Sequence, residues 1–168
     1  MKDKLHKRIK RQLAFFMMAL FFSGLTAIPV AAELRFLLKI LPSDSQAAIL
    51  FSEILAAYVD VSTQYHYLLY GYDWLAFAHF VLAILFIGPY RDPLRNIWVI
   101  EFGLLACVLV IPYALVAGTL RGLPFWWLLG DCSFGVIGFV LLWRIRMHIK
   151  MLSRLSTHSV HQKPLYAL

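Results

Sequence analysis

The sequence has little charge. Only 15% of its 168 residues are Asp, Glu, Lys or Arg, whereas about 25% are charged in an ordinary soluble domain. Apolar residues make up 61% of the chain, and its mean hydropathy is +0.73. A globule of 19.3 kDa cannot bury so much apolar surface. A soluble enzyme and a disordered chain are therefore excluded, and an integral membrane protein is indicated.

Cysteine is also scarce. Cys107 and Cys132 are the only two, both lie in apolar stretches, and they are not spaced as CxxC. This excludes a disulfide framework and a zinc knuckle. The sequence predicts no metal site and no cofactor, and no motif in it names a reaction.

Four apolar segments approach the roughly 20 residues that cross about 30 Å of hydrocarbon. They cover about residues 13–31, 74–89, 97–117 and 125–143. The second is short, so it must stand nearly upright or use its flanking aromatic residues. We predict an all-α bundle of four transmembrane helices, forming one domain over residues 1–155, with a mobile cytoplasmic tail over residues 156–168.

The lysines and arginines orient this bundle. All sixteen except Arg35, Lys39 and Arg121 lie before the first span, between the second and third spans, or after the fourth. By the positive-inside rule both termini are cytoplasmic, and residues 32–72 and 118–124 face outward. The net charge of +7 then follows from topology and from attraction to the lipid bilayer. No nucleic-acid partner is expected.

The first span has an alternative interpretation. A basic start, the apolar run 13–22 and the small residues 30–32 are also typical of a cleaved secretory signal. Cleavage would leave three spans. The apolar stretch of about 19 residues is long for a signal core, and Ser23 and Gly24 suit helix packing. A retained span is favoured, and cleavage stays open.

Residues 32–72 form the largest segment outside the predicted spans. Residues 42–45 (PSDS) predict a helix start. Apolar side chains follow on one face, whereas Gln46, Glu53 and Asp60 recur on the other. This predicts an amphipathic helix on the outer face of the bundle. It either rests on the headgroups or serves as a lid or partner-docking surface.

Two ionisable residues lie near the outer ends of the predicted spans, where such groups are functional candidates. His79 and Asp131 are each about six residues inside the second and fourth spans, or about 9 Å deep. We expect an outer-leaflet polar cluster of His79, Asp131 and Tyr113, with Arg121 or Asp73 at its rim. The cluster is either a hydrogen-bonded clasp or a site for a proton, an ion or a lipid-like ligand.

A third ionisable residue, Glu101, lies about four residues into the third span from its cytoplasmic side. It is expected to reach the inner interface or to pair with Arg95 or Arg144. The alternative is that Glu101 belongs to a polar path across the membrane, although no chain of polar residues links it to the outer cluster.

Small residues form two stripes at helical spacing. Such stripes allow close approach of two helices, so helix packing is the expected role. The stripes consist of Gly103, Ala106, Cys107, Val110, Ala114 and Ala117 in the third span, and Gly135 and Gly138 in the fourth.

Four short blocks carry a resemblance. Residues 70–79 (YGYDWLAFAH), 88–93 (GPYRDP), 130–135 (GDCSFG) and 23–27 (SGLTA) resemble a family of small four-span bacterial inner-membrane proteins without a known activity. The resemblance covers most of the chain. It implies a bacterial inner membrane and a four-helix unit, and it implies no ligand or catalytic residue.

The function expected from the sequence is a non-catalytic one. The small-residue stripes favour an assembly or accessory subunit that forms a homo-oligomer or joins a larger membrane-protein partner. The alternative is a small transporter or membrane enzyme that uses the His79 and Asp131 cluster.

Overall fold

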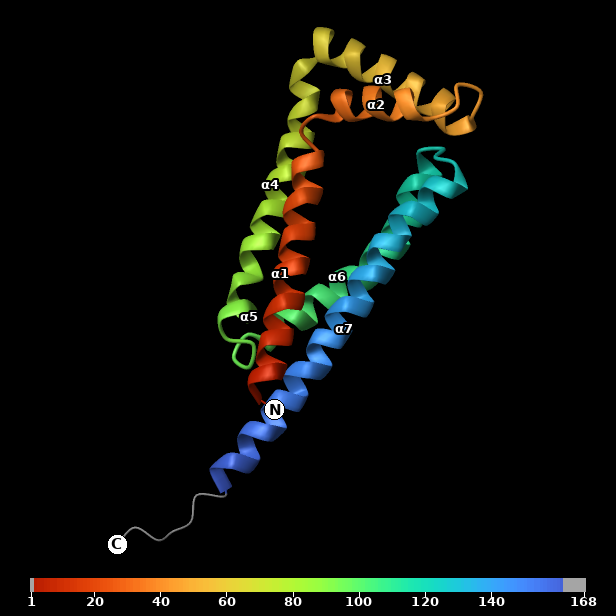
Figure 1. Cartoon of the computed structure of the whole chain (residues 1–168). Helices are drawn as coiled ribbons and strands as arrows, with labels where there is room; N and C mark the ends of the chain where they lie inside the picture. The colour runs from red at the N-terminus through yellow and green to blue at the C-terminus, as the bar shows by residue number, and fades with distance from the viewer. Residues whose placement is uncertain (1, 162–168) are drawn as a thin grey trace, which may run out of the picture. The chain divides into compact units, whose positions relative to one another are not determined.

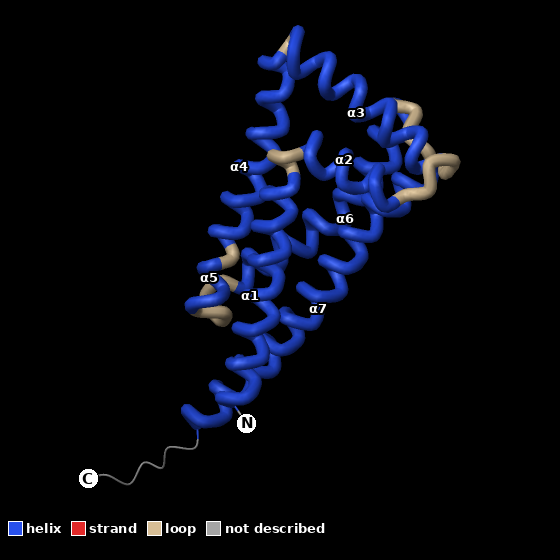
Figure 2. Tube along the Cα trace, turned by 45° about the horizontal axis from the view of Figure 1, so that its top comes forward, coloured by secondary structure: helices blue, strands red, loops and turns tan. Residues whose placement is uncertain are grey.

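The computed structural model describes residues 2–161 of the chain (Figure 1). Within this range all regular secondary structure is helical, as the sequence predicts, and short loops join the helices (Figure 2). The elements are α1 (Lys2–Thr26), α2 (Val30–Ile40), α3 (Gln46–Gln64), the 3₁₀ helix η1 (His66–Leu69), α4 (Tyr70–Leu85), α5 (Ile87–Arg91), α6 (Ile97–Leu120) and α7 (Phe125–His161).

Three helical segments are long and apolar enough to cross a membrane. They are His66–Arg91, which joins η1, α4 and α5, then Ile97–Leu120, and Phe125–Ser156. A fourth crossing is present only if α1 and α2 are taken together as one bent span. Residues 2–161 therefore contain three or four candidate spans.

The first predicted span, residues 13–31, is not one straight helix. Helix α1 ends at Thr26, and α2 begins at Val30 at an angle of 93° to it. Pro29 stands at the break, where its ring lacks an N–H and disfavours a helical conformation for the residue before it. Only residues 12–26 of α1 follow its last charged side chain, and a helix of that length is about 22 Å long.

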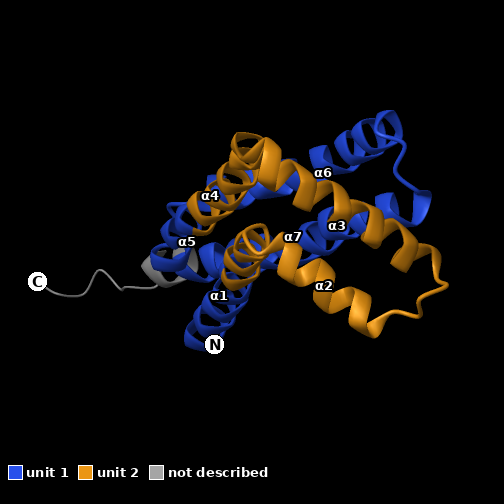
Figure 3. Ribbon diagram, turned by 90° about the horizontal axis from the view of Figure 1, so that it is seen from above, with its two compact units in different colours: residues 1–17, 84–168 blue, residues 18–83 orange. Residues whose placement is uncertain are grey.

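The contacts divide the chain into two compact units (Figure 3). Unit 1 contains Met1–Met17 and Ile84–Leu168, and unit 2 contains Met18–Ala83. Helices α1 and α4 each run from one unit into the other.

The core of unit 1 comes from three separate stretches of chain. Its fully buried side chains lie in the first half of α1, in α5 with the start of α6, and in the middle of α7. The spacings within α1 and α7 are three and four residues, which place the side chains on one face of each helix. These residues are Ile9, Leu13, Pro89, Val99, Ile100, Leu142, Ile145 and Ile149.

Helices α6 and α7 form the main helix pair of unit 1 and lie side by side (Figure 1). Glycines allow this approach. A Cβ atom at Gly135 would lie 2.8 Å from the Cys107 carbonyl oxygen, and one at Gly138 would lie 2.9 Å from Cys107 Sγ. A Cβ atom at Gly103 would lie 2.8 Å from a methyl group of Leu142.

Unit 2 contains the α2–α3 hairpin. Helix α3 begins where the sequence predicts, because Ser45 is its N-cap and accepts a hydrogen bond from the Ala48 N–H at 3.1 Å. Helix α2 was not predicted as a separate element. The last part of α1 approaches α4 in this unit, since a Cβ atom at Gly24 would lie 2.9 Å from the Ala76 carbonyl oxygen.

The expected tail over residues 156–168 is helical in its first part, because α7 continues to His161. The rest of that segment, residues 162–168, lies outside the described residues.

We expect Gly135→Ala to lower the stability of the fold by about 1–3 kcal/mol, because its new methyl group meets backbone that cannot move cheaply. Gly130→Ala is the matched control, since nothing lies within 4 Å of a Cβ atom there. Thermal unfolding in a mild detergent measures both. Equal midpoints for the two variants would contradict the close approach at Gly135.

Candidate functional site

His79 is half-buried in α4 and is held by its own helix. Its Nδ1 lies 2.8 Å from the carbonyl oxygen of Leu75, one turn earlier. A carbonyl oxygen only accepts, so Nδ1 is the donor and Nε2 of the neutral ring is an acceptor. Beside the ring, a Cβ atom at Gly24 would lie 2.8 Å from the His79 Cβ. The α1–α4 approach in unit 2 and the intrahelical bond therefore fix the position of this imidazole.

Asp131 has a partner that the sequence analysis missed. Its carboxylate is hydrogen-bonded to the side chain of Trp127. The indole N–H is a donor only, so it satisfies one carboxylate oxygen from within α7. The two residues are four apart, which places their side chains one above the other on a helix. The four-residue spacing of Trp127 and Asp131 can be read from the sequence alone.

Two other expected members of the outer cluster, Tyr113 and Arg121, are exposed side chains of unit 1, which also contains Asp131. Tyr113 is 73% exposed, and Arg121, the C-cap of α6, is exposed. Among the described residues no hydrogen bond joins either side chain to Asp131. His79 and the exposed Asp73 belong to unit 2, so their meeting with Asp131 stays a prediction.

Glu101 pairs with Arg146 of α7. Both Nε and Nη2 of Arg146 donate to Glu101 Oε1, at 3.1 and 2.9 Å. The guanidinium also lies 5.6 Å from the centre of the Trp143 ring, where a cation is attracted to the aromatic face. The expected partners, Arg95 and Arg144, are exposed, whereas Arg146 follows the buried Ile145 at the edge of the packed face of α7.

Two interactions tie α1 to the rest of unit 1 at its basic end. The ammonium group of Lys10 lies 5.5 Å from the centre of the Tyr90 ring, in α5. Gln12 Oε1 lies 3.0 Å from Nδ1 of His148, in α7. The start of α1, helix α5 and residue 148 of α7 are therefore at the same end of unit 1.

The block 88–93, which contributed to the family resemblance, builds a turn. The Asp92 carboxylate accepts hydrogen bonds from the N–H groups of Leu94 and Arg95 at 3.1 and 3.0 Å. The Asn96 side chain donates to the carbonyl oxygens of Gly88 and Asp92 at 3.2 and 3.0 Å. Local hydrogen bonds of this kind hold a turn rigid, so the block has a structural role.

The predicted packing residues divide into two groups. Gly103 and Gly135 are buried and Gly138 is half-buried, in the contact between α6 and α7. Ala114 is half-buried, whereas Ala106 is exposed. The glycines thus serve packing inside the chain, and Ala106 is left on the surface of α6.

The cysteines are free and half-buried. Cys132 Sγ lies 4.0 Å from the carbonyl oxygen of Ile111, which links α7 to α6. Within residues 2–161 no group of three or more His, Cys, Asp and Glu side chains is arranged to hold a metal ion.

Comparisons of the chain with protein-family models, with curated proteins and with solved structures find no match. The family resemblance drawn from the four sequence blocks stays a prediction.

A double-mutant cycle tests the pair across α6 and α7. Glu101→Gln and Arg146→Gln are expected to be coupled by about 0.2–1 kcal/mol in thermal unfolding, because each removes the same partly exposed ion pair. Glu101→Gln combined with Arg144→Gln is the control and is expected to be additive. Coupling to Arg144 instead of Arg146 would contradict the observed pairing.

Proposed function

We propose that the chain is a small multi-pass protein of the bacterial inner membrane that acts by assembly. In this proposal it is a non-catalytic subunit that packs with itself or with a larger membrane protein. The observation that carries it is a surface row on α6 with two alanines, one exposed and one half-buried, described below.

Membrane insertion is supported by large apolar side chains that the fold leaves uncovered. Leu120 is 81% exposed, Phe134 74% and Phe125 68%, and many others on α4, α6 and α7 are more than one-third exposed. A soluble monomer rarely carries so much contiguous apolar surface. In a bilayer the same side chains contact lipid, and the helices satisfy their own backbone groups.

The proposed orientation has both termini in the cytoplasm. The contacts of Lys10 with Tyr90 and of Gln12 with His148 support it, because they bring three of the chain's basic segments to one end of unit 1. One basic end on a helix bundle is what the positive-inside rule requires. Residues 32–72 then face outward, and we place α3 there as an amphipathic helix, with Ala48 buried and Glu53 exposed.

A retained first segment is part of the proposal. Ile9 and Leu13 of α1 are fully buried in the core of unit 1, and the Phe16 ring packs against Phe86 with their centres 4.8 Å apart. Cleavage of α1 as a signal would expose this core.

The row on α6 consists of Ala106, Tyr113 and Ala117, which we call the Ala106 seam. These positions follow the spacing of one helix face. Ala106 and Tyr113 are exposed, and Ala117 is half-buried. Small side chains let a second helix approach closely in a membrane. Because Gly103 and Gly135 are already used inside the chain, the Ala106 seam is the surface that we assign to assembly.

Ala106→Leu is expected to reduce the assembled fraction at least about tenfold, because a larger side chain keeps the partner helix at a distance. Native mass spectrometry in a mild detergent measures that fraction. The unfolding midpoint is expected to stay unchanged, because Ala106 is exposed within the chain.

Ala78→Leu is the matched control, since Ala78 is an exposed alanine of α4 outside the seam. It is expected to leave assembly intact. Recovery of lone protomers from the unmodified chain, or an equal loss of assembly in both variants, would overturn the assembly role.

A second candidate function is a site for a proton, an ion or a lipid-like ligand at His79. The observation that favours it is the imidazole of His79, whose Nδ1 is occupied by Leu75 while Nε2 remains an acceptor. Ionisable groups in spanning helices are functional candidates. A transporter or membrane enzyme would use such a group.

This candidate predicts a discrete bound mass in native spectra that is absent from His79→Ala and present in His66→Ala. His66 is the control because it is an exposed histidine of η1, outside the candidate cluster. Equal retention of the bound mass by both variants would contradict this candidate function.

A further inference from the structure

Helix α2 has an apolar face that the described residues leave exposed. Phe36 is 62% exposed and Ile40 65%, and Leu37 beside them is exposed as well. Residues 36 and 40 are one turn apart, so their side chains lie on one side of the helix. Leu34 is buried instead, where α2 packs along α3. The apolar face of α2, formed by Phe36, Leu37 and Ile40, is therefore not used in packing the hairpin.

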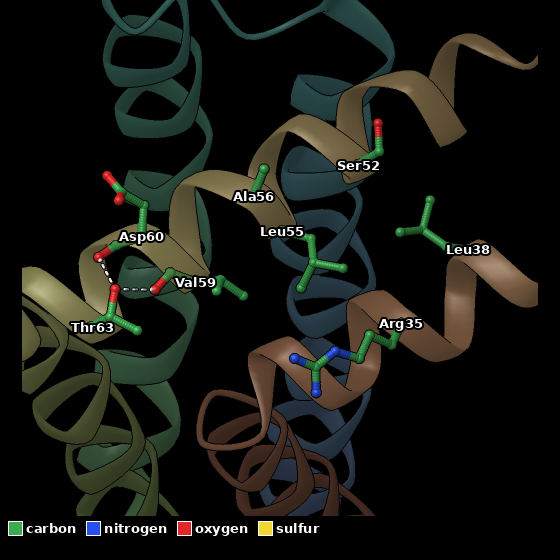
Figure 4. Close-up of a pocket in the computed structure, with 8 residues that line it drawn as sticks. All are labelled: Arg35, Leu38, Ser52, Leu55, Ala56, Val59, Asp60 and Thr63. Atoms are coloured by element: carbon green, nitrogen blue, oxygen red, sulfur yellow. Dashed lines mark hydrogen bonds between the residues drawn. The ribbon is translucent and has the colours of Figure 1, made fainter.

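The other side of α2 borders a shallow groove between α2 and α3 (Figure 4). Arg35 and Leu38 line the groove from α2, and Asp60 is among the residues that line it from α3. At about 100° per residue, positions 36 and 40 point roughly opposite to positions 35 and 38. The hairpin therefore has a side with charged residues, at the groove, and an apolar side, away from it.

The charges of α2 suit a position at a membrane surface. Arg35 and Lys39 are both exposed, and their spacing of four residues places them on one side of the helix, next to the apolar face. Long basic side chains can extend from such a position to the lipid phosphate groups. Glu33 lies in the first turn, where the helix dipole stabilises an acid. Separate basic and apolar sides are typical of a helix that lies in the plane of a membrane interface.

The bend after α1 gives α2 the direction that such a helix needs. The two helices meet at 93°, and α2 turns sharply away from the axis of α1 (Figure 1). When α1 runs along the membrane normal, α2 lies parallel to the membrane plane. Its apolar face can then contact lipid along the whole helix.

The length of α1 gives α2 the depth that such a helix needs. Residues 12–26 follow Arg11, the last charged side chain of α1, and they are about 22 Å long. The hydrocarbon core of a bilayer is about 30 Å thick. With Arg11 at the inner edge of this core, the bend lies about 8 Å below the outer edge. An interfacial helix buries its apolar face to a similar depth, about 5–10 Å.

We propose that α2 is an in-plane membrane helix whose apolar face inserts among the acyl chains of the outer leaflet. Arg35 and Lys39 contact the lipid phosphate groups, and the groove toward α3 faces the water. The α1–α2 segment therefore enters the bilayer and then turns along its outer surface. The inference rests on the membrane insertion and orientation proposed above, and it is independent of assembly through the Ala106 seam.

The test measures the surroundings of a nitroxide label on single-cysteine variants of the full chain in phospholipid vesicles. Cys107 and Cys132 are replaced by alanine in all variants. Oxygen collides most with a label in lipid, a water-soluble nickel chelate collides most with a label in water, and both collide little with a label inside a protein contact. At Ile40→Cys the nickel collision rate is expected to be at least about fivefold lower than at Ile49→Cys, and the oxygen collision rate is expected to be higher.

Ile49→Cys is the matched control. Ile49 is an isoleucine of α3 that is 52% exposed, and it lies on the same side of α3 as the polar residues Gln46 and Glu53. Leu105→Cys is the reference for a label in hydrocarbon, because Leu105 is an exposed side chain of the candidate span α6.

A second pair of variants keeps both native cysteines. Ile40→Gln is expected to lower the unfolding midpoint of the chain in lipid nanodiscs, because an amide group is costly to place among acyl chains. Ile49→Gln is expected to leave the midpoint unchanged, because its side chain stays in water.

Equal nickel collision rates at positions 40 and 49 would overturn the proposal. Low collision rates of both reagents at position 40 would do the same, since the apolar face would then contact protein. Equal midpoints of the two glutamine variants would also contradict it. A high nickel collision rate at position 105 would reject the proposed membrane insertion itself. Lipid-like rates at position 105 with water-like rates at position 40 would reject the inference about α2 alone.

Discussion

The close approach of α6 and α7 is the constraint on which unit 1 depends. At Gly135 the backbone of the facing helix is so near that a Cβ atom would lie 2.8 Å from the Cys107 carbonyl oxygen. This contact sets the register of the two helices. With the register set, Glu101 comes opposite Arg146, and a face of α7 that includes Leu142 becomes available to the core that α1 completes. A larger side chain at Gly135 is therefore expected to disturb both the Glu101–Arg146 ion pair and the core.

Under the proposed membrane insertion, the polar groups of the apolar helices face a second constraint, the absence of water in hydrocarbon. A polar side chain there must find a partner within protein, and the nearest one is usually on its own helix. His79 bonds to Leu75, Asp131 to Trp127, and Thr119 to Leu115 at 2.7 Å. In the groove between α2 and α3 the situation differs, because Arg35 has no partner in the described chain. Arg35 is exposed, so its guanidinium can be hydrated.

The candidate site was only partly predictable for a physical reason. Helical spacing alone indicates which residues share a face, so the bond between Trp127 and Asp131 was within reach of the sequence. The partner of Glu101 could not be predicted from the sequence, because the choice between Arg144 and Arg146 depends on how α7 is rotated about its axis against α6. The same rotation decides which small residues of α6 pack against α7. It turns Gly103 into the helix contact and leaves Ala106 exposed.

Composition and local pattern by themselves determined the helical fold, the long apolar helices and the cap of α3 at Ser45. Each of these depends on side chains within a few residues of one another and on the solvent that surrounds them. Only the tertiary structure decided the bend of 93° between α1 and α2, the division into two units and the pairing of α2 with α3. The break between α1 and α2 follows from Pro29, whereas the angle, the division and the pairing depend on contacts between helices, whose energies cannot be read from the hydrophobic period of either helix.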